Sequence, residues 1–339
     1  MSRSAITRRS VLAGGVLGLA TLAGCSSSRL QGGDGGPIRL DLAHVGDMNS
    51  PQQRIAEILR EKLNARSDEF DLVIHDSGTL GNETELQGAA VDGTIDLAIA
   101  ASFSHYAPWA GILETPMLFR SNTDFRDFAR GPIGDAVMTD LADELDIVPL
   151  FIAPHESPRA ITTARTPVRD PEDLHRLKIR NPEVPSYTVM AEAVGAVPVT
   201  LDFGELYLAL DRGVVDGQHN PLGHVVGQSF YEVQDYLSMV PWGTTPHIVS
   251  ASSHTWDRLS ASHRELIEEV ANETSEEYFN VADTEMEERL EFLKDKIEIV
   301  PQEDINLKAF EDILSDNISN LAESYDKRSI DILEAIREI

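Results

Sequence analysis

The chain has 339 residues, of which 42% are hydrophobic, so it can bury a large core, and its length is typical of two domains or lobes. Its 57 aspartate and glutamate residues outnumber 28 lysine and arginine residues, and the formal net charge is −29 at pH 7. This balance argues against nucleic-acid binding, which requires a basic face. Because molar salt shortens the Debye length to ~3 Å, we interpret the dispersed acidity as halophilic; an ordinary acidic extracytoplasmic protein is the alternative.

The N-terminus carries the features of an export signal. Arg8 and Arg9 precede an apolar run over 11–23, which resembles a twin-arginine signal, and the small residues before Cys25 resemble a lipobox. The run is shorter than the roughly 20 apolar residues of a transmembrane helix. We therefore predict an exported protein, anchored to the outer face of the cytoplasmic membrane by a lipid on Cys25, with 26–37 as a flexible tether. A cytosolic chain with an apolar N-terminal arm is the alternative.

The segments that follow alternate between strand and helix patterns. Apolar residues at every second position predict a strand over 38–44, and a serine followed by proline opens a helical stripe over 50–63. Two further strands are predicted at 70–75 and 95–100, joined by a helix within 83–93. This β-α-β-α-β order indicates a parallel sheet covered by helices.

A weak internal echo indicates a second lobe built like the first. Segments 85–96 and 205–216 each have a helical pattern followed by a glycine, a pair of β-branched residues and a final aspartate. We expect Val214 and Val215 to form a buried strand, followed by a turn. Because ligands of open α/β sheets bind beyond the carboxyl ends of the strands, the residues after each final aspartate should face one shared cleft.

The C-terminal third has a different pattern. Residues 262–296 are nearly free of proline and glycine, and their apolar positions recur at helical spacing among acidic residues. This predicts one long amphipathic helix or a pair of helices with a solvated acidic face.

Catalytic motifs are absent from the sequence, which has no hydrolase nucleophile motif, no phosphate-binding loop and no zinc-protease motif. His219 and His224, with Asp216, are the metal alternative, but their spacing of five does not stack them on one helix face. We predict no metal, no cofactor and no enzymatic activity; a secreted hydrolase is the enzyme alternative.

Two arginines are placed to reach a cleft. Arg159 follows the apolar segment "PLFIAP" at 149–154, and Arg180 ends the strand-like segment "LKIR" at 177–180. A planar guanidinium at such a position can hold a carboxylate through two parallel hydrogen bonds. The alternative for each is an ordinary ion pair with a surface carboxylate.

Four segments resemble the solute-binding proteins of TRAP transporters, the tripartite ATP-independent periplasmic systems. They are "GTLGNETELQGAAVDGTIDLAIA", "PEDLHRLKIRNPE", "AVGAVPVTLDFGELYLALDRGVVDGQHNP" and "VQDYLSMVPW". The resemblance implies a two-lobed α/β fold like that of periplasmic binding proteins, with a mostly parallel sheet in each lobe and a long C-terminal helix crossing both. The expected lobes are 38–157 plus about 246–285, and 158–245 plus about 286–339.

The resemblance also implies a carboxylate site. Arg180 matches the family's carboxylate clamp, Arg159 matches a second arginine, and Asn220 matches an asparagine that orients the carboxylate. His219 stands where the family usually has glutamate, and Phe203 matches an aromatic residue of the pocket.

The other wall of the pocket is expected to read the rest of the solute. His44 and Glu83 match its positions, residues 100–104 lie near them, and Trp242 is expected to cover the cleft. These residues indicate a solute with polar groups beyond its carboxylate, such as a sugar acid, while a C4-dicarboxylate or another organic acid stays open. The implied function is delivery of this acid to the small and large membrane subunits of a cation-coupled permease; a sensor subunit on the same fold is the alternative.

Overall fold

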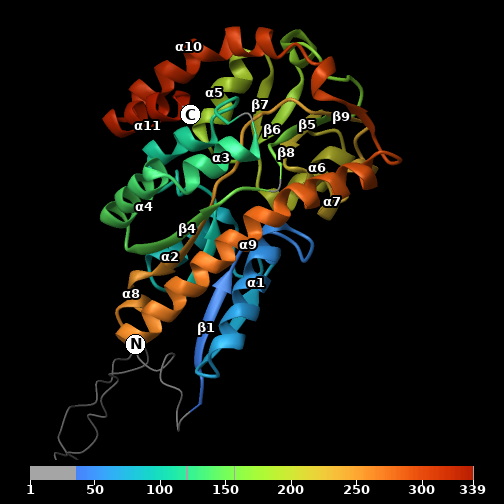
Figure 1. Cartoon of the computed structure of the whole chain (residues 1–339). Helices are drawn as coiled ribbons and strands as arrows, with labels where there is room; N and C mark the ends of the chain where they lie inside the picture. The colour runs from blue at the N-terminus through green and yellow to red at the C-terminus, as the bar shows by residue number, and fades with distance from the viewer. Residues whose placement is uncertain (1–35, 120, 156, 339) are drawn as a thin grey trace, which may run out of the picture.

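The computed structural model describes residues 36–119, 121–155 and 157–338. It contains two mixed β-sheets flanked by helices, one in the lower and one in the upper half of Figure 1. This confirms the predicted α/β fold with two sheets. The predicted export signal and Cys25 lie outside the described residues.

The first sheet has five strands in the order β2-β1-β3-β10-β4. Their bounds are β1 Ile38–Ala43, β2 Phe70–His75, β3 Leu97–Ala100, β4 Ile147–Ala153 and β10 His247–Ser252. β1 pairs in parallel with β2 and β3, which confirms the predicted β-α-β-α-β unit, whereas β10 runs antiparallel to both β3 and β4. The chain returns from the second sheet to supply β10.

The second sheet has six strands in the order β11-β9-β5-β8-β6-β7. Their bounds are β5 Ala160–Thr163, β6 Lys178–Asn181, β7 Val197–Thr200, β8 Gly217–Asn220, β9 Tyr236–Ser238 and β11 Glu298–Val300. Both antiparallel pairs of this sheet involve β5, which pairs with β8 and with β9, and the other pairs are parallel. The antiparallel strand of each sheet is therefore the one that enters from the other sheet, since β5 follows β4 and β10 follows β9.

The prediction of a strand at Val214 and Val215 is wrong, because the strand β8 begins three residues later, at Gly217. The backbone N–H groups of both valines donate to the carbonyl oxygen of Ala209, which lies in the preceding helix Leu206–Asp211. The Val214 side chain is 50% exposed. The pairing of β8 with β5 and β6 begins only at Gly217. The turn thus lies before the aspartate, and the polar residues after it form the strand itself.

Helices cover the sheets and join them. They are α1 Pro51–Arg66, α2 Glu83–Val91, η1 Pro108–Glu114, α3 Asn122–Ala129, α4 Pro132–Glu144, α5 Pro185–Ala193, α6 Leu206–Asp211, α7 Leu222–Gly227, α8 Ser253–Trp256, α9 Ala261–Leu293, α10 Leu307–Tyr325 and α11 Lys327–Arg337, where η1 is a 3₁₀ helix. Their caps follow the sequence: Ser50 Oγ accepts from the Gln53 N–H at the start of α1, and Asn82 and Glu85 form a capping box on α2.

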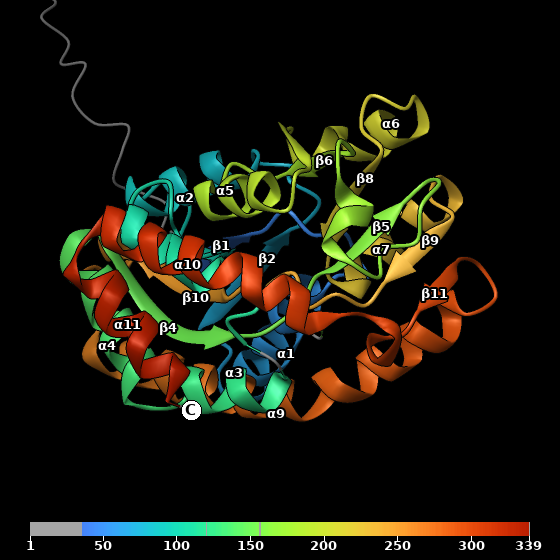
Figure 2. The ribbon, with the colours of Figure 1, turned by 90° about the horizontal axis from the view of Figure 1, so that it is seen from above.

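The long helix α9 connects the two halves of the molecule. It is one continuous helix of 33 residues, which decides between the two predicted forms. It packs along α1 and β4 of the first half and reaches α7 of the second, as Figure 1 and the view from above in Figure 2 show. The last two helices also join the halves, since α10 packs on α5 and η1, and α11 packs on η1 and α4.

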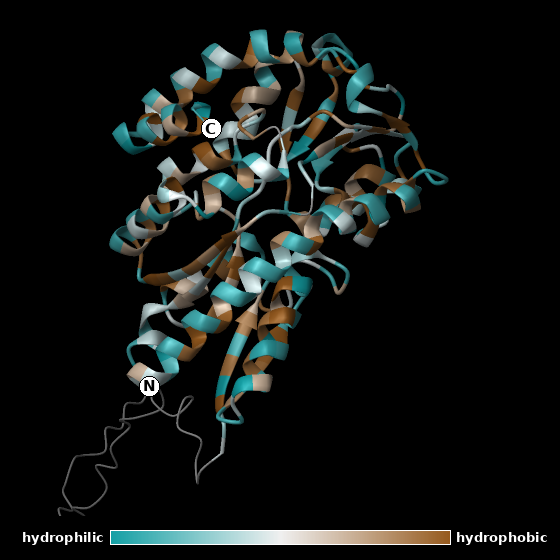
Figure 3. Ribbon diagram, in the orientation of Figure 1, coloured by the Kyte–Doolittle hydropathy of each residue, from teal (hydrophilic) through white to brown (hydrophobic). Residues whose placement is uncertain are grey.

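The core lies between the sheets and their helices. Figure 3 shows hydrophobic residues concentrated on the interior strands and hydrophilic residues spread over the outer helices. Trp109, Trp242, Tyr187 and Tyr278 are the largest of the fully buried side chains. In the described part of the chain, no helix combines the length and the apolar character needed to cross a membrane.

Candidate functional site

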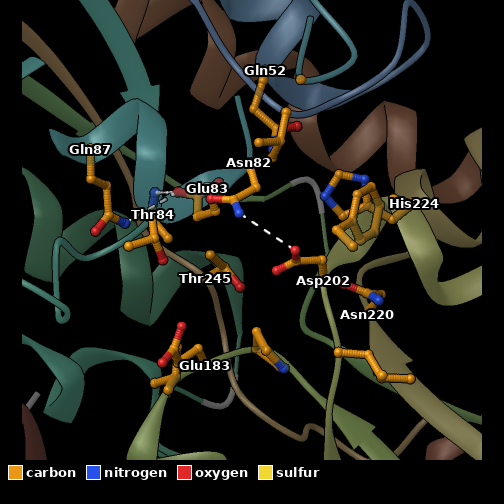
Figure 4. A pocket seen from close by; sticks show the side chains of 18 of the residues that line it. Gln52, Asn82, Glu83, Thr84, Gln87, Glu183, Asp202, Asn220, His224 and Thr245 are labelled. Atoms are coloured by element: carbon orange, nitrogen blue, oxygen red, sulfur yellow. Dashed lines mark hydrogen bonds between the residues drawn. The ribbon is translucent and has the colours of Figure 1, made fainter. Parts of the chain in front are cut away.

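A cavity of about 560 Å³ lies where residues of both sheets converge. The first sheet contributes Ala101 and Ser104, which follow the end of β3, and the second contributes Arg180 of β6 and Asn220 of β8. Helix α2 adds Glu83 and Gln87, and Figure 4 shows these side chains around one opening. The cavity therefore lies beyond the carboxyl ends of the strands, as expected, and its size is that of a small-molecule site.

Arg180 is the cation of this cavity that lacks a full set of partners. Its side chain is 3% exposed, and its Nε donates to the Leu201 carbonyl oxygen at 2.9 Å. Among the described residues, no hydrogen bond is made by its Nη1 or Nη2. Burial, reinforced by the positive charge of Arg159, lowers the pKa of Arg180 to about 9. An anion in the cavity would supply the missing acceptors and counter-charge.

Arg159, which lies one residue before β5, has by contrast almost all of its donors occupied. Its Nε donates to His219 Nδ1 at 2.9 Å and its Nη1 to Thr245 Oγ1 at 2.5 Å. Its Nη2 donates to the His219 carbonyl oxygen and to Asn220 Oδ1, both at 2.9 Å. The guanidinium also stacks 5.0 Å from the ring centre of Tyr187. Arg159 therefore fixes the strand end that presents Asn220.

His219 links this network to β6. Because an arginine N–H can only donate, His219 Nδ1 must be the acceptor, so the ring proton lies on Nε2 and is donated to Asn181 Oδ1 at 3.0 Å. Burial and the charges of Arg159 and Arg180 hold the pKa of His219 well below its usual value. A neutral histidine thus stands at this position.

Two carboxyl groups occupy the opposite wall. One Glu83 oxygen accepts from the Ala101 N–H at 2.7 Å and from Gln87 Nε2 at 3.3 Å. Glu114, which is 1% exposed, accepts from Ser102 Oγ at 2.5 Å. Burial raises the pKa of both glutamates. In the described part of the chain, this wall therefore offers hydrogen-bonding groups and no lysine or arginine side chain.

Three histidines meet at the edge of the cavity. His155 lies after β4, His247 begins β10 and His224 lies on α7. The ring centres of His155 and His247 are 4.1 Å apart, and those of His155 and His224 are 4.8 Å apart. Burial, aided by neighbouring positive charges, holds the pKa values of His155 and His247 well below the usual histidine value. They are neutral imidazoles.

The two walls touch at the mouth of the cavity. Asn82 Nδ2 donates to Asp202 Oδ2 at 3.5 Å, the contact drawn across the opening in Figure 4. Gln228 Nε2 donates to Asp47 Oδ2 at 3.2 Å. These contacts join residues from the two halves of the chain, so side chains bridge the opening from both sides.

Most of the predicted site residues line the cavity: Arg180, Arg159, Asn220, Phe203 and Glu83. His44 and Trp242 are not among the lining residues. His44 is fully buried behind the wall and contacts Gln53 Oε1 through Nε2 at 3.1 Å. Trp242 is 1% exposed and packs between His219 and Phe310. Trp242 is thus buried in the core and does not cover the opening.

Other lining residues were not found from the sequence: Gln52, Glu114, His155, Thr245 and His247. A signal existed for two of them, because His155 directly follows an apolar strand and His247 directly precedes one. Nothing marked Glu114, which ends the otherwise apolar "PWAGILE" of η1.

The described residues contain no group of three or more histidine, cysteine, aspartate or glutamate side chains arranged to hold a metal ion. His219 and His224, the metal alternative, belong to separate clusters: the former bonds Arg159, and the latter lies against His155 and Phe203.

The chain is similar to known solute-binding proteins. Residues 42–324 match the model of the family "Bacterial extracellular solute-binding protein, family 7". The chain is 26% identical over 291 residues to the 2,3-diketo-L-gulonate-binding periplasmic protein YiaO of Escherichia coli, covering 85% of this chain and 86% of that protein.

Solved structures share the fold. The sugar acid binding protein of Advenella mimigardefordensis in complex with galactonate superposes with a TM-score of 0.83 at 22% identity, covering 89% of this chain and 99% of that one. A TRAP periplasmic solute binding protein of Shewanella oneidensis with bound succinate superposes with a TM-score of 0.81, again at 22% identity and with 89% and 99% covered.

Proposed function

The chain belongs to the bacterial extracellular solute-binding proteins of family 7 and binds an organic acid for a TRAP transporter, and from this premise we propose that Arg180 holds the acid by its carboxylate. The predicted resemblance to this family is confirmed. The members of the family are solute-binding proteins rather than enzymes, and we assign this chain binding without catalysis.

One observation supports the role of Arg180 above the others: it is a buried guanidinium whose terminal nitrogens make no hydrogen bond among the described residues. Leaving a charged group without partners in the interior is costly, and two charge-assisted bonds to a carboxylate contribute about 1.5–3 kcal/mol each. Asn220, held at 2.9 Å by Arg159, stands beside this position on the neighbouring strand and supplies an amide.

Arg180→Ala tests this role by isothermal titration calorimetry with a set of carboxylic acids. Loss of two charge-assisted bonds is expected to weaken binding by about 100-fold or more. Arg165→Ala, at an exposed arginine outside the cavity, is the matched control and should bind normally. Equal affinity in Arg180→Ala and the wild-type protein would show that Arg180 does not bind the carboxylate.

The two sheets are the cores of two lobes in this proposal, and the lobes close around the acid. The supporting geometry is the pair of chain crossings before β5 and β10, the helix α9 that spans both halves, and the contacts at the mouth of the cavity. The bound acid is then delivered to the small and large membrane subunits of the transporter.

We also propose that Cys25 is lipidated after export and holds the protein at the outer face of the cytoplasmic membrane. The support is the sequence before it, with Arg8 and Arg9, the apolar run and the small residues. In cell fractionation, Cys25→Ser should move the protein from the membrane to the soluble extracytoplasmic fraction, and a variant that stays with the membrane would contradict the anchor.

A further inference from the structure

Among the described lining residues of the cavity, arginine side chains come from one wall only, whereas carboxyl groups come from both. Arg159 and Arg180 are the only lysine or arginine residues among its described lining residues, and both come from the second half of the chain. The lining carboxyl groups are Glu83, Glu114, Glu183, Asp202 and Glu205. Because Arg159 is occupied by its own network, the cavity has one free cationic clamp. A second carboxylate that reaches the first-half wall would face Glu83 and Glu114, and no described lining residue on that wall is a lysine or arginine.

Unsatisfied acceptors lie on the wall opposite the clamp. Gln52 Oε1 and Gln87 Oε1 are buried and have no hydrogen-bond partner in the described part of the chain. Gln87 Nε2 donates to Glu83 Oε1, which fixes the orientation of the Gln87 amide. The Oε1 atom of Gln87 therefore remains available to accept a hydrogen bond. Since a carboxylate is also an acceptor, it cannot satisfy these oxygens, whereas a hydroxyl group can donate to them.

His247 has the same need in a more specific form. It lines the cavity and is 2% exposed, and neither of its ring nitrogens has a hydrogen-bond partner among the described residues. A neutral imidazole has one donor and one acceptor, so both are left unsatisfied. A hydroxyl group both donates and accepts, while an ammonium group only donates. Cations are also disfavoured here because Arg159 lies close by and contributes to the electrostatics of this ring.

We propose that the solute is a monocarboxylate whose carbon chain carries several hydroxyl groups, and that His247 determines this specificity by hydrogen bonding to one of them. The inference rests on the proposed function: Arg180 holds the carboxylate, while His247, Gln52 and Gln87 read the hydroxyl groups. An unsatisfied buried polar atom costs free energy in the empty protein, and a matching hydroxyl restores the bond.

The first experiment compares acids by calorimetry with the whole mature protein. The probes are C4–C6 aldonates, including D-gluconate, against hexanoate, succinate and L-lysine. We expect at least one aldonate to bind ~100-fold or more tightly than hexanoate, because a site built for hydroxyl groups rejects analogues that lack them. Tighter binding of succinate, hexanoate or lysine than of every aldonate would overturn the inference.

The second experiment locates the specificity. His247→Phe should weaken aldonate binding about tenfold, equivalent to ~1.4 kcal/mol, and leave hexanoate binding within about twofold of its wild-type value. His247→Gln, which keeps a donor and an acceptor, should retain most of the aldonate affinity. If the phenylalanine variant does not fold, His247→Leu, which also lacks a donor and an acceptor, replaces it. His254→Phe, at an exposed histidine of α8, is the matched control.

The outcomes separate the two proposals. If His247→Phe weakens hexanoate and aldonates equally, or leaves both unchanged, His247 has no part in reading hydroxyl groups and the inference fails. If succinate binds in an Arg180-dependent manner and no aldonate does, the proposed function stands and only the solute class is wrong. If no acid binding depends on Arg180, the proposed function fails first.

Discussion

The two walls of the cavity differ in how far their hydrogen bonds are completed within the protein. On the second-half wall, Arg159 joins His219, Thr245 and Asn220 in one network, whereas Nη1 and Nη2 of Arg180 make no hydrogen bond among the described residues. On the first-half wall, the Oε1 atoms of Gln52 and Gln87 have no hydrogen-bond partner among the residues that the structure describes. One wall is thus fixed for a single charged group, and the other is open to several neutral ones. The difference separates the residues that anchor the acid from those that select it.

The largest effect is expected from Arg159→Ala. It leaves His219 Nδ1 and Asn220 Oδ1 without their donor, and each buried acceptor left unsatisfied costs about 1–3 kcal/mol. The free energy of unfolding should therefore fall by about 2–6 kcal/mol. Solute affinity should also fall, because the Asn220 side chain keeps its bond to Gln218 Oε1 but loses the one to Arg159. Chemical denaturation followed by fluorescence measures the first effect, and calorimetry the second.

Arg180→Ala provides the contrast. Since burial lowers the pKa of Arg180, its charged form is disfavoured in the empty folded protein, and removing it should leave the thermal midpoint unchanged or raised while binding is lost. If both arginine variants lose stability to the same degree, the distinction between a network arginine and a free clamp is not valid.

This contrast also marks what the sequence could predict. Arg180 and Arg159 were predicted because each follows or ends an apolar, strand-like segment, and Asn220 because it lies in a motif that resembles a known family; all three line the cavity. The pairing of β10 with β3 and β4 was not predicted, since its partners lie at least 94 positions earlier in the chain. His155 and His247 meet only through that pairing, with His247 opposite Ala153 at the end of β4. The neighbourhood of these two histidines therefore depends on tertiary structure, although each stands beside an apolar strand in the sequence.

His44 shows the converse limit. A polar residue directly after a buried strand has the pattern of a cleft residue, but its ring is held by Gln53 from the first turn of α1. The neighbouring Gln52 reaches the cavity instead. Because adjacent helix positions face different directions, a shift of one residue decides which side chain contacts solute, and the sequence pattern alone does not resolve it.

An intermediate effect, with a defined pH dependence, is expected at Glu114 on the first-half wall. Burial raises the pKa of Glu114 above its ordinary value of 4.5, so the folded protein binds this proton more tightly than the unfolded chain. The corresponding stability is present at low pH and is lost as the pH rises through the folded-state pKa. Glu114→Gln cannot ionise, so its thermal midpoint should gain on the wild-type midpoint between pH 4 and pH 8. A constant difference over this range would show that folding does not raise the pKa of Glu114.

The smallest effect is expected where the two walls touch. Gln228→Ala removes the 3.2 Å bond from Gln228 Nε2 to Asp47 Oδ2; Gln228 lines the mouth of the cavity but is not one of the groups proposed to bind the solute. A partly exposed bond of this kind contributes about 0.5–1.5 kcal/mol to the closed form, so affinity should fall about two- to tenfold, mainly through faster dissociation. Gln302→Ala, at an exposed glutamine on η5 (Gln302–Asp304), is the control. Stopped-flow measurement of the solute dissociation rate tests this prediction. An unchanged rate would mean that the contact at the mouth does not hold the walls together. The contacts of the solute inside the cavity would then be sufficient to keep the two walls together.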